Sequence, residues 1–347
     1  MTADTPRVSR RDALRAATGL LAGAAIASLG ACARQRGQHV PALAAALQGL
    51  TAEFMQLWLH GARAHPAIVR GLATLTVFDG RLDALNQANQ LETIITQRYA
   101  AILLVPVDVE AETEPARHAK DAGIPVIGSN TLLSDTSVYA SYIGSDDVQG
   151  GRLVARAVAS GLRGRGNVVI LEGPIGQSAQ IQRSAGIQDV LNGYPGVKVL
   201  ETRSANWSRA EAITLMENWL TAHPGEINGV IAQNDEMALG ALEAIKARSL
   251  DPASLHVAGI DGISDALEAV KRGEMSTTLQ DARAQSQGAI DLALRRLLGP
   301  TYTPLSSIWK DYAGQLDWGD GTRREFRVPW VPVTRDNVDR LIEMRKH

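Results

Sequence analysis

The strongest constraint on the fold of this chain is a regular alternation of short apolar runs with amphipathic helical stretches. Residues 228–250 show one complete unit of this pattern. The apolar run at 230–232 follows an Asn-Gly pair, which is typical of the start of a buried strand. After a polar turn, apolar side chains recur at three- and four-residue spacing, which predicts a helix that Asn234 or Asp235 can cap. In sheets built from such units, ligands bind at the turn that follows the strand.

The same alternation continues through most of the chain and predicts parallel sheets with helices on both faces. Strands are predicted at residues 74–78, 101–105, 124–127, 139–143, 168–171, 197–201, 230–232, 256–260, 276–279 and 328–333. These ten strands are more than one ordinary sheet contains. The polar residues 144–147 interrupt the pattern, and we expect the chain to cross there between two lobes. We therefore predict an α/β protein with two doubly wound parallel-sheet lobes joined by a hinge of several crossings. Residues 41–50 are ambiguous, because their composition favours a helix and their position favours a first strand.

Composition excludes several classes of function. With 347 residues, 45% of them hydrophobic, the chain can bury a large core in two domains. The net charge is -2 and the body has no basic run, so a nucleic-acid partner is not expected. We find no nucleophile–base pair, no paired carboxylates and no metal-ligand spacing, so we expect no enzyme activity, no metal and no cofactor.

The first 32 residues have the form of a bacterial export signal. A twin-arginine region at 9–15 precedes a short apolar core at 20–29, and the core is too short to span a bilayer, which takes roughly 20 residues. Residues 29–32, Leu-Gly-Ala-Cys, resemble a lipoprotein cleavage site, so we expect the mature protein to begin at a lipidated Cys32 outside the cytoplasm. The export route stays open, because Ala13 stands where a bulky apolar residue is usual in twin-arginine signals. A membrane anchor and a buried core cysteine are the alternatives to lipidation.

Polar side chains follow the predicted strands with a consistent chemistry. They are amides, one carboxylate, one guanidinium and one aromatic group: Gln48, Asn130, Asn234, Asp261, Gln280, Arg183 and Trp207. Planar amide and carboxylate groups can hold adjacent hydroxyls, and an aromatic face can cover the C–H face of a sugar ring. The simpler alternatives are a helix cap for Asn234, a turn residue for Asp261 and a hydrophobic staple for Trp207. The pattern favours a site that holds a polyhydroxylated neutral molecule without cutting it.

Residues 233–241, QNDEMALGA, resemble the corresponding turn of the ribose-binding-protein-like family, the periplasmic sugar-binding receptors of ABC importers. Further similar stretches lie at 101–108, 122–126, 143–151, 258–262 and 331–338. The resemblance covers residues from about 85 to 298 well and implies two lobes that close on the ligand about a hinge. Within the resemblance, Asn234, Asp261 and Gln280 match hydroxyl-holding positions. Trp207 and Phe54 fall where stacking aromatics are usual, although Phe54 also fits a plain helix core.

The chain also departs from the family pattern, mainly in the first lobe. Arg183 matches the second of two arginines near the start of its helix, and Ile181 occupies the place of the arginine that contacts sugar. Asn130 stands where an aspartate is common, Thr131 where an arginine follows it, and Ala52 where an asparagine is usual. These departures disfavour ribose itself and favour another sugar or a polyol.

The resemblance and the sequence together predict a domain plan. Residues 1–32 form the signal, 41–144 with 281–309 the N-terminal lobe, and 145–280 with 310–347 the C-terminal lobe. We expect a monomeric, lipid-anchored, extracytoplasmic receptor that delivers a monosaccharide or polyol to an ABC permease and its ATPase. The alternative is a receptor that presents a sugar-like signal to a membrane chemoreceptor or kinase. A regulator of the lac-repressor type would carry a helix-turn-helix where this chain has its signal and Cys32.

Overall fold

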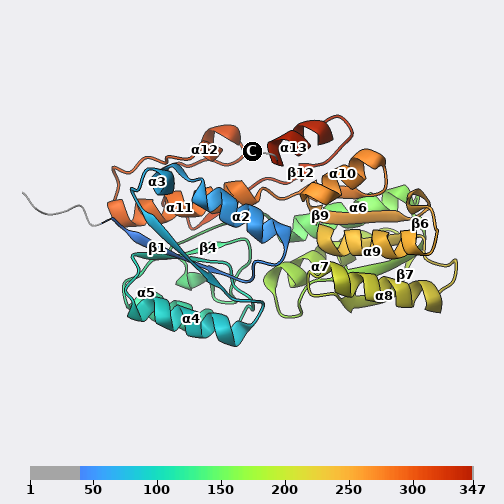
Figure 1. Ribbon diagram of the computed structural model, residues 1–347, viewed down its shortest axis with the longest axis horizontal. Coiled ribbons are helices and arrows are strands. Elements are labelled where there is room, and N and C mark those ends of the chain that lie inside the picture. The colour runs from blue at the N-terminus through green and yellow to red at the C-terminus, as the bar shows by residue number, and fades with distance from the viewer. Residues whose placement is uncertain (1–39, 346–347) are drawn as a thin grey trace, which may run out of the picture. The chain divides into compact units, whose positions relative to one another are not determined.

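The computed structural model describes residues 40–345 and contains two six-stranded sheets (Figure 1). The strand order is β11-β5-β4-β3-β1-β2 in the first sheet and β12-β10-β9-β8-β6-β7 in the second. Neighbouring strands are parallel except β10 and β12, which are antiparallel. The chain crosses between the sheets after β5, after β10 and after β11. The predicted fold class, two doubly wound lobes with a hinge of several crossings, is confirmed.

The first sheet is covered by helices on both faces. Its strands are β1 (Ala42–Leu47), β2 (Thr74–Asp79), β3 (Ala101–Leu104), β4 (Val126–Ser129), β5 (Ser141–Gly144) and β11 (Glu325–Arg327). Its helices are α2 (Glu53–Arg63), α3 (Pro66–Val69), α4 (Ala84–Thr96), α5 (Thr113–Asp121), a 3-10 turn at Thr136–Val138 and α11 (Ala282–Leu298). Leu43, Ala45 and Leu47 pack in the core that contains α2 and α11, and Ala44 and Ala46 pack with α4 and α5. Within the ambiguous residues 41–50, Ala42–Leu47 thus form a strand, because burial on both faces between β2 and β3 outweighs local helix propensity.

The second sheet follows the same plan. Its strands are β6 (Arg165–Glu172), β7 (Gly196–Ser204), β8 (Gly229–Ala232), β9 (His256–Asp261), β10 (Ser276–Leu279) and β12 (Val331–Pro332). Its helices are α6 (Asp147–Gly161), α7 (Ser178–Leu191), α8 (Arg209–Ala222), α9 (Asp235–Ala247), a 3-10 turn at Pro252–Ser254, α10 (Ser264–Arg272) and α13 (Val338–Arg345). On β8, Ile231 packs with α6 and α7, whereas Val230 packs with α8 and α9. This alternation is what a strand buried between two helical layers requires.

One part of the predicted domain plan is wrong. We expected residues 310–347 to belong to the second lobe, but β11 pairs in parallel with β5 of the first sheet. The last crossing therefore lies between β11 and β12, beyond the predicted lobe boundary at residue 309. Of the strand predicted at 328–333, only Val331–Pro332 forms, as β12, and β11 (Glu325–Arg327) precedes the predicted range. Pro329 and Pro332 lack the N–H groups that one continuous strand would need.

The segment between α11 and β11, which includes α12 (Ile308–Asp311), is fixed to the first lobe by a buried carboxylate. Asp291 of α11 accepts hydrogen bonds from Tyr302 Oη at 2.6 Å, Trp309 Nε1 at 2.8 Å and Ser306 Oγ at 2.8 Å, and it contacts His65 Nε2 at 3.1 Å. Burial alone would raise the pKa of Asp291, but the contacts with His65 and Tyr302 outweigh it and hold the pKa below its usual value. These bonds explain why the polar, aromatic segment follows the first sheet.

Candidate functional site

The eight side chains that the sequence singled out line one cavity of about 30 Å³ between the two sheets. They are Gln48, Phe54, Asn130, Arg183, Trp207, Asn234, Asp261 and Gln280. Strand ends, helix starts and the hinge supply them, because the carboxyl ends of parallel strands meet at one sheet edge. A space of this volume holds roughly two water molecules, so a larger ligand requires side chains or lobes to move. Their convergence is observed, and their role as ligand contacts stays a prediction.

Arg183 is held rigidly by the second lobe. Its Nε donates to Asp147 Oδ1 at 2.8 Å, and both side chains are almost fully buried. Burial raises the pKa of Asp147, and the guanidinium opposes that rise. The guanidinium carbon lies 5.5 Å from the centre of the Trp207 ring, and Nη2 donates to Gln280 Oε1 at 3.3 Å. Because its charge is already paired, Arg183 offers hydrogen bonds and not a free cation for an acidic ligand.

The position of Arg183 depends on a close approach of α6 and α7. A Cβ at Gly151 of α6 would lie 2.1 Å from the carbonyl oxygen of Arg183. A Cβ at Gly186 of α7 would lie 2.0 Å from the carbonyl oxygen of Val148. Only glycine permits this helix contact, which brings Arg183 within reach of Asp147.

Asp261 is the least satisfied polar side chain at the cavity. It is 4% exposed, and its carboxylate has no hydrogen-bond partner among residues 40–345. Burial raises the pKa of Asp261 well above its usual value, with Arg183 opposing the rise. Its φ of 123° is one that L-residues rarely adopt, and such strain is common at binding sites. The geometry presents two acceptor oxygens to whatever enters the cavity.

Asn234 combines two tasks. Its Oδ1 accepts from Met237 N at 3.0 Å and caps α9. The helix cap that the sequence offers as the simpler role of Asn234 is therefore present. Its Nδ2 donates no hydrogen bond within the described part of the chain and borders the cavity. The side chain can therefore cap the helix with its oxygen and offer its amide protons to a ligand.

Trp207 is fixed at the end of β7 by its backbone and its ring. Its φ is 58°, and a Cβ at Gly173 would lie 2.0 Å from the indole, so the ring packs directly on that glycine. Residues 208–211, Ser-Arg-Ala-Glu, have the sequence of a capping box, which forms only in part. Ser208 Oγ accepts from Glu211 N at 3.3 Å, but the Glu211 carboxylate accepts from Asn206 Nδ2. The expected bond from the Ser208 N–H goes to a backbone carbonyl instead.

Beneath the cavity, a cluster of buried amides lies at the hinge. Asn130 Nδ2 donates to Gln280 Oε1 at 3.4 Å and to Gln285 Oε1 at 3.2 Å. The Nε2 atoms of Gln280 and Gln285 are buried and have no partner among the described residues. Since an unmet buried donor costs about 1–3 kcal/mol, Gln280 at the cavity wall favours a ligand that brings acceptor oxygens.

Sequence reasoning missed Gln177, which connects both lobes at this cavity. Its Nε2 donates to Gln48 Oε1 and, at 3.3 Å, to the carbonyl of Val107 in the first lobe. Its Oε1 accepts from Trp207 Nε1 at 2.7 Å. The available signal was its position directly before α7, where the turn after β6 ends. Ala52, Met55 and Ala179 complete the lining.

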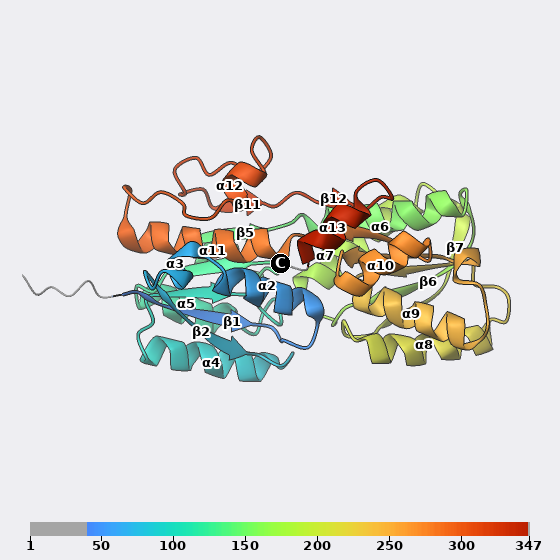
Figure 2. The same cartoon turned by 45° about the horizontal axis from the view of Figure 1, so that its top comes forward.

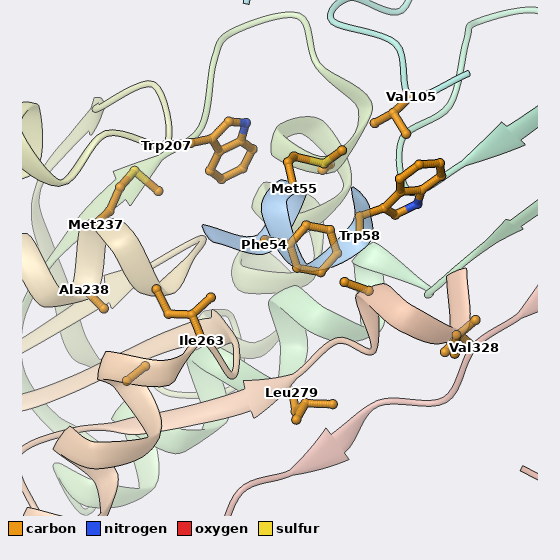
Figure 3. Close-up of a cluster of buried hydrophobic side chains, with 14 of the residues drawn as sticks. Phe54, Met55, Trp58, Val105, Trp207, Met237, Ala238, Ile263, Leu279 and Val328 are labelled. Carbon is orange, nitrogen blue, oxygen red and sulfur yellow. The ribbon is translucent and has the colours of Figure 1, made fainter. Parts of the chain in front are cut away.

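The apolar walls of the cavity come from opposite lobes. Figure 3 shows Phe54 and Met55 of α2 in one buried cluster with Trp207 of the second lobe. Phe54 is 5% and Trp207 8% exposed, and both border the cavity. Two apolar faces with polar groups between them suit a ring or carbon chain that carries hydroxyls.

The described residues form neither a metal-ligand cluster nor a membrane-spanning helix. Within residues 40–345, no three His, Cys, Asp or Glu side chains gather as metal ligands. No described helix combines the length and hydropathy of a membrane span. The predicted export signal and Cys32 lie outside the described residues.

Comparison with known proteins shows the family. A model described as a periplasmic binding protein domain matches residues 44–301. A xylitol-binding protein of Mycolicibacterium smegmatis is 40% identical over 262 residues, covering 75% of this chain and 68% of that protein. A D-apiose import binding protein of Paraburkholderia graminis is 37% identical over 246 residues, covering 68% of this chain and 77% of that protein.

A solved structure agrees with these relatives. An ABC transporter solute-binding protein from Bacillus halodurans, with bound myo-inositol, superposes with a TM-score of 0.77 at 29% identity. The match covers 89% of this chain and 99% of that one. The chain therefore belongs to the periplasmic binding protein family and is a solute receptor of the ribose-binding-protein-like kind, not an enzyme.

Proposed function

We propose that this protein captures a sugar or polyol between its lobes and delivers it to the permease of an ABC importer. The single observation that carries the proposal is the hydrogen-bonding balance of the cavity. Asp261 offers unpaired acceptors, Gln280 Nε2 and Asn234 Nδ2 offer donors, and the charge of Arg183 is paired. Hydroxyl groups both donate and accept, so a neutral polyhydroxylated ligand satisfies all of these groups at once.

The names of the relatives support the same class of ligand. Xylitol, D-apiose and myo-inositol are all uncharged compounds with several adjacent hydroxyls. Of the first-lobe departures from the family pattern, Ala52 and Asn130 line the cavity, and Thr131 follows Asn130 and donates its hydroxyl to the Pro106 carbonyl. They favour a ligand other than ribose for this chain.

Capture by hinge closure follows from the two-lobe arrangement. Gln177 and Gln48 meet across the cavity, and outside it the Leu132 N–H of the first lobe donates to Ser178 Oγ of the second at 2.7 Å. A ligand that satisfies groups on both walls stabilises the closed form over the open one. The lobes we propose are 41–144 with 281–327, and 145–280 with 328–347.

Membership of the family places the protein outside the cytoplasm. We propose in addition that Cys32 is lipidated and tethers the receptor to the membrane. Metabolic labelling with a fatty acid, compared between the native chain and Cys32→Ser, checks this point. Label that persists in Cys32→Ser would contradict the lipid anchor.

A thermal-shift screen of residues 33–347 tests the ligand class. We expect xylitol, myo-inositol or a related polyol to raise the melting temperature, since a ligand that binds only the folded state stabilises it. Isothermal titration of Asp261→Asn should show affinity lower by about 10- to 100-fold, because the amide replaces one acceptor oxygen by a donor and leaves a buried ligand hydroxyl unpaired, at about 1–3 kcal/mol. A chain that binds only an amino acid or peptide would contradict the proposal.

A further inference from the structure

Two helices that meet at the mouth of the cleft lack caps of their own. Helix α2 of the first lobe begins after Ala52, which cannot cap it, and α10 of the second lobe begins after Ile263, which cannot either. The first N–H groups of a helix need partners, and a carboxylate there also interacts favourably with the helix dipole. These two helix ends are therefore open to a partner from elsewhere in the fold.

Each lobe supplies the missing partner for the other. Glu53 Oε1, on α2, accepts from Ser264 N at 2.9 Å and from Ser264 Oγ at 2.6 Å at the start of α10. In return, Glu53 N donates to Glu236 Oε1 of α9 at 3.3 Å. Figure 2 shows α2 next to α9 and α10, as these bonds require. The carboxylate of each lobe thus accepts a hydrogen bond from the start of a helix in the other lobe.

Glu236, the second-lobe carboxylate of this contact, is itself held in place. Arg209 Nε donates to Glu236 Oε2 at 2.8 Å, and Arg209 Nη1 donates to Asp265 Oδ2 at 2.9 Å. The Glu236 side chain is 14% exposed, so water screens it only in part. A carboxylate fixed in this way loses little side-chain entropy when it meets the N–H of Glu53.

The exchange lies beside the ligand cavity but outside it. None of Glu53, Glu236 and Ser264 lines the cavity; all three border a separate groove of about 1210 Å³ next to α13. Their neighbours in the chain do line it. Phe54 follows Glu53 on α2, and Asp261 precedes α10 by a short turn. The contact therefore sets how the two halves of the cavity face each other.

We propose that Glu53, Glu236 and Ser264 form a cross-lobe latch, a set of positioning residues that determines ligand affinity without touching the ligand. The proposal rests on the proposed function only for its effect on affinity. The latch bonds exist only when the lobes are closed, so they raise the fraction of closed molecules before ligand arrives. Because ligand binds the closed form, apparent affinity scales with that fraction.

Lobe closure is measured first, without any ligand. Residues 33–347 contain no cysteine, since the only one is Cys32, so two introduced cysteines can be labelled cleanly. Leu85→Cys on α4 and Asn218→Cys on α8 place one exposed dye on each lobe for single-molecule energy transfer. We expect Glu53→Ala to increase the open population, with Glu53→Gln intermediate because it keeps an acceptor oxygen. Unchanged closure in Glu53→Ala would overturn the latch, whatever the ligand proves to be.

Affinity is then measured by isothermal titration with xylitol and with myo-inositol. We expect about tenfold weaker binding for Glu53→Ala, and a smaller loss for Ser264→Ala, which keeps its backbone donor. Glu114→Ala removes a first-turn glutamate of α5 that makes no cross-lobe bond and should leave both readouts unchanged. Weaker binding with unchanged closure would contradict the latch, because Glu53 would then act on the cavity itself. If neither polyol binds the native chain, the proposed function fails while the closure measurement still decides the latch.

Discussion

At the scale of single residues, Asn234 shows why a cap and a ligand contact need not be alternatives. Its oxygen is committed to Met237 N, and its amide nitrogen is free to face the cavity. From the sequence alone the two roles are alternatives, because the sequence does not show that the oxygen and the nitrogen of the amide have different surroundings. The side chain has enough hydrogen-bonding groups for both.

The substitution Asn234→Ser separates these roles. Serine caps helices about as well as asparagine and adds no charge, so the free energy of unfolding should change by less than about 0.5 kcal/mol. The amide donor is lost, so ligand affinity should fall by at least about tenfold. Chemical denaturation and isothermal titration measure the two effects. Native affinity in Asn234→Ser would remove Asn234 from the site.

Glu112 is a buried acid away from the cavity that predicts a pH dependence. Burial raises its pKa from 4.5 to about 7, with the hydrogen bond from Asp108 N opposing the rise, and its Oε1 has no partner among the described residues. The folded state binds this proton more tightly than the unfolded chain. The stability that Glu112 contributes is therefore full below pH 4.5 and lost as pH rises through about 7.

Glu112→Gln should remove that dependence. We expect the variant to be about 1–3 kcal/mol more stable than the native chain at pH 8, and similar to it at pH 4.5. Urea denaturation at both pH values measures the difference. Parallel pH profiles for the two chains would show that Glu112 does not titrate between them.

At the scale of elements, the contact between α6 and α7 controls the site more directly than either helix alone. The sequence predicted both helices, but nothing in their apolar spacing shows that Gly151 lies against the backbone of Arg183. Asp147, in the first turn of α6, and Arg183, in the second turn of α7, meet only because the helices approach this closely. The salt bridge between Arg183 and Asp147 is thus a property of the helix pair.

Gly151→Ala tests this dependence. Alanine favours an isolated helix by about 1 kcal/mol, but its Cβ would collide with backbone, so we expect a net destabilisation of about 1–3 kcal/mol. Gly288→Ala on α11 is the matched control, because its Cβ meets the movable end of the Ile143 side chain at 2.3 Å. Thermal melts compare the two. Equal losses of stability would mean that the contact of Gly151 with the Arg183 backbone costs no more to disturb than a contact with a movable side chain.

At the scale of the whole molecule, the site exists only where the lobes meet. Gln177 bonds to Gln48 and Val107 in one lobe and to Trp207 in its own, so it helps to close the cavity and also occupies part of it. A side chain in that position limits the size of the ligand. Its removal should therefore change selectivity as well as affinity.

We expect Gln177→Ala to weaken xylitol binding and to raise the ratio of sorbitol to xylitol affinity by about tenfold, since a longer polyol can fill the space that the amide leaves. Gln182→Ala, one turn further along α7 and outside the cavity lining, serves as the control. Competition titrations with both polyols give the ratio. An unchanged ratio would show that Gln177 does not limit ligand length.

The sequence by itself determined the fold class and the eight positions that converge at the cavity. It could do so because strand and helix periods are local, and because the ends of parallel strands must share one edge of a sheet. Only the tertiary structure decided that Ala42–Leu47 form a strand, that β11 joins the first sheet, and that Gln177 spans the lobes. The same holds for the latch, in which Glu53 and Ser264 are 211 positions apart. Contacts of this kind depend on which surfaces meet after folding, and no local pattern in the chain encodes them.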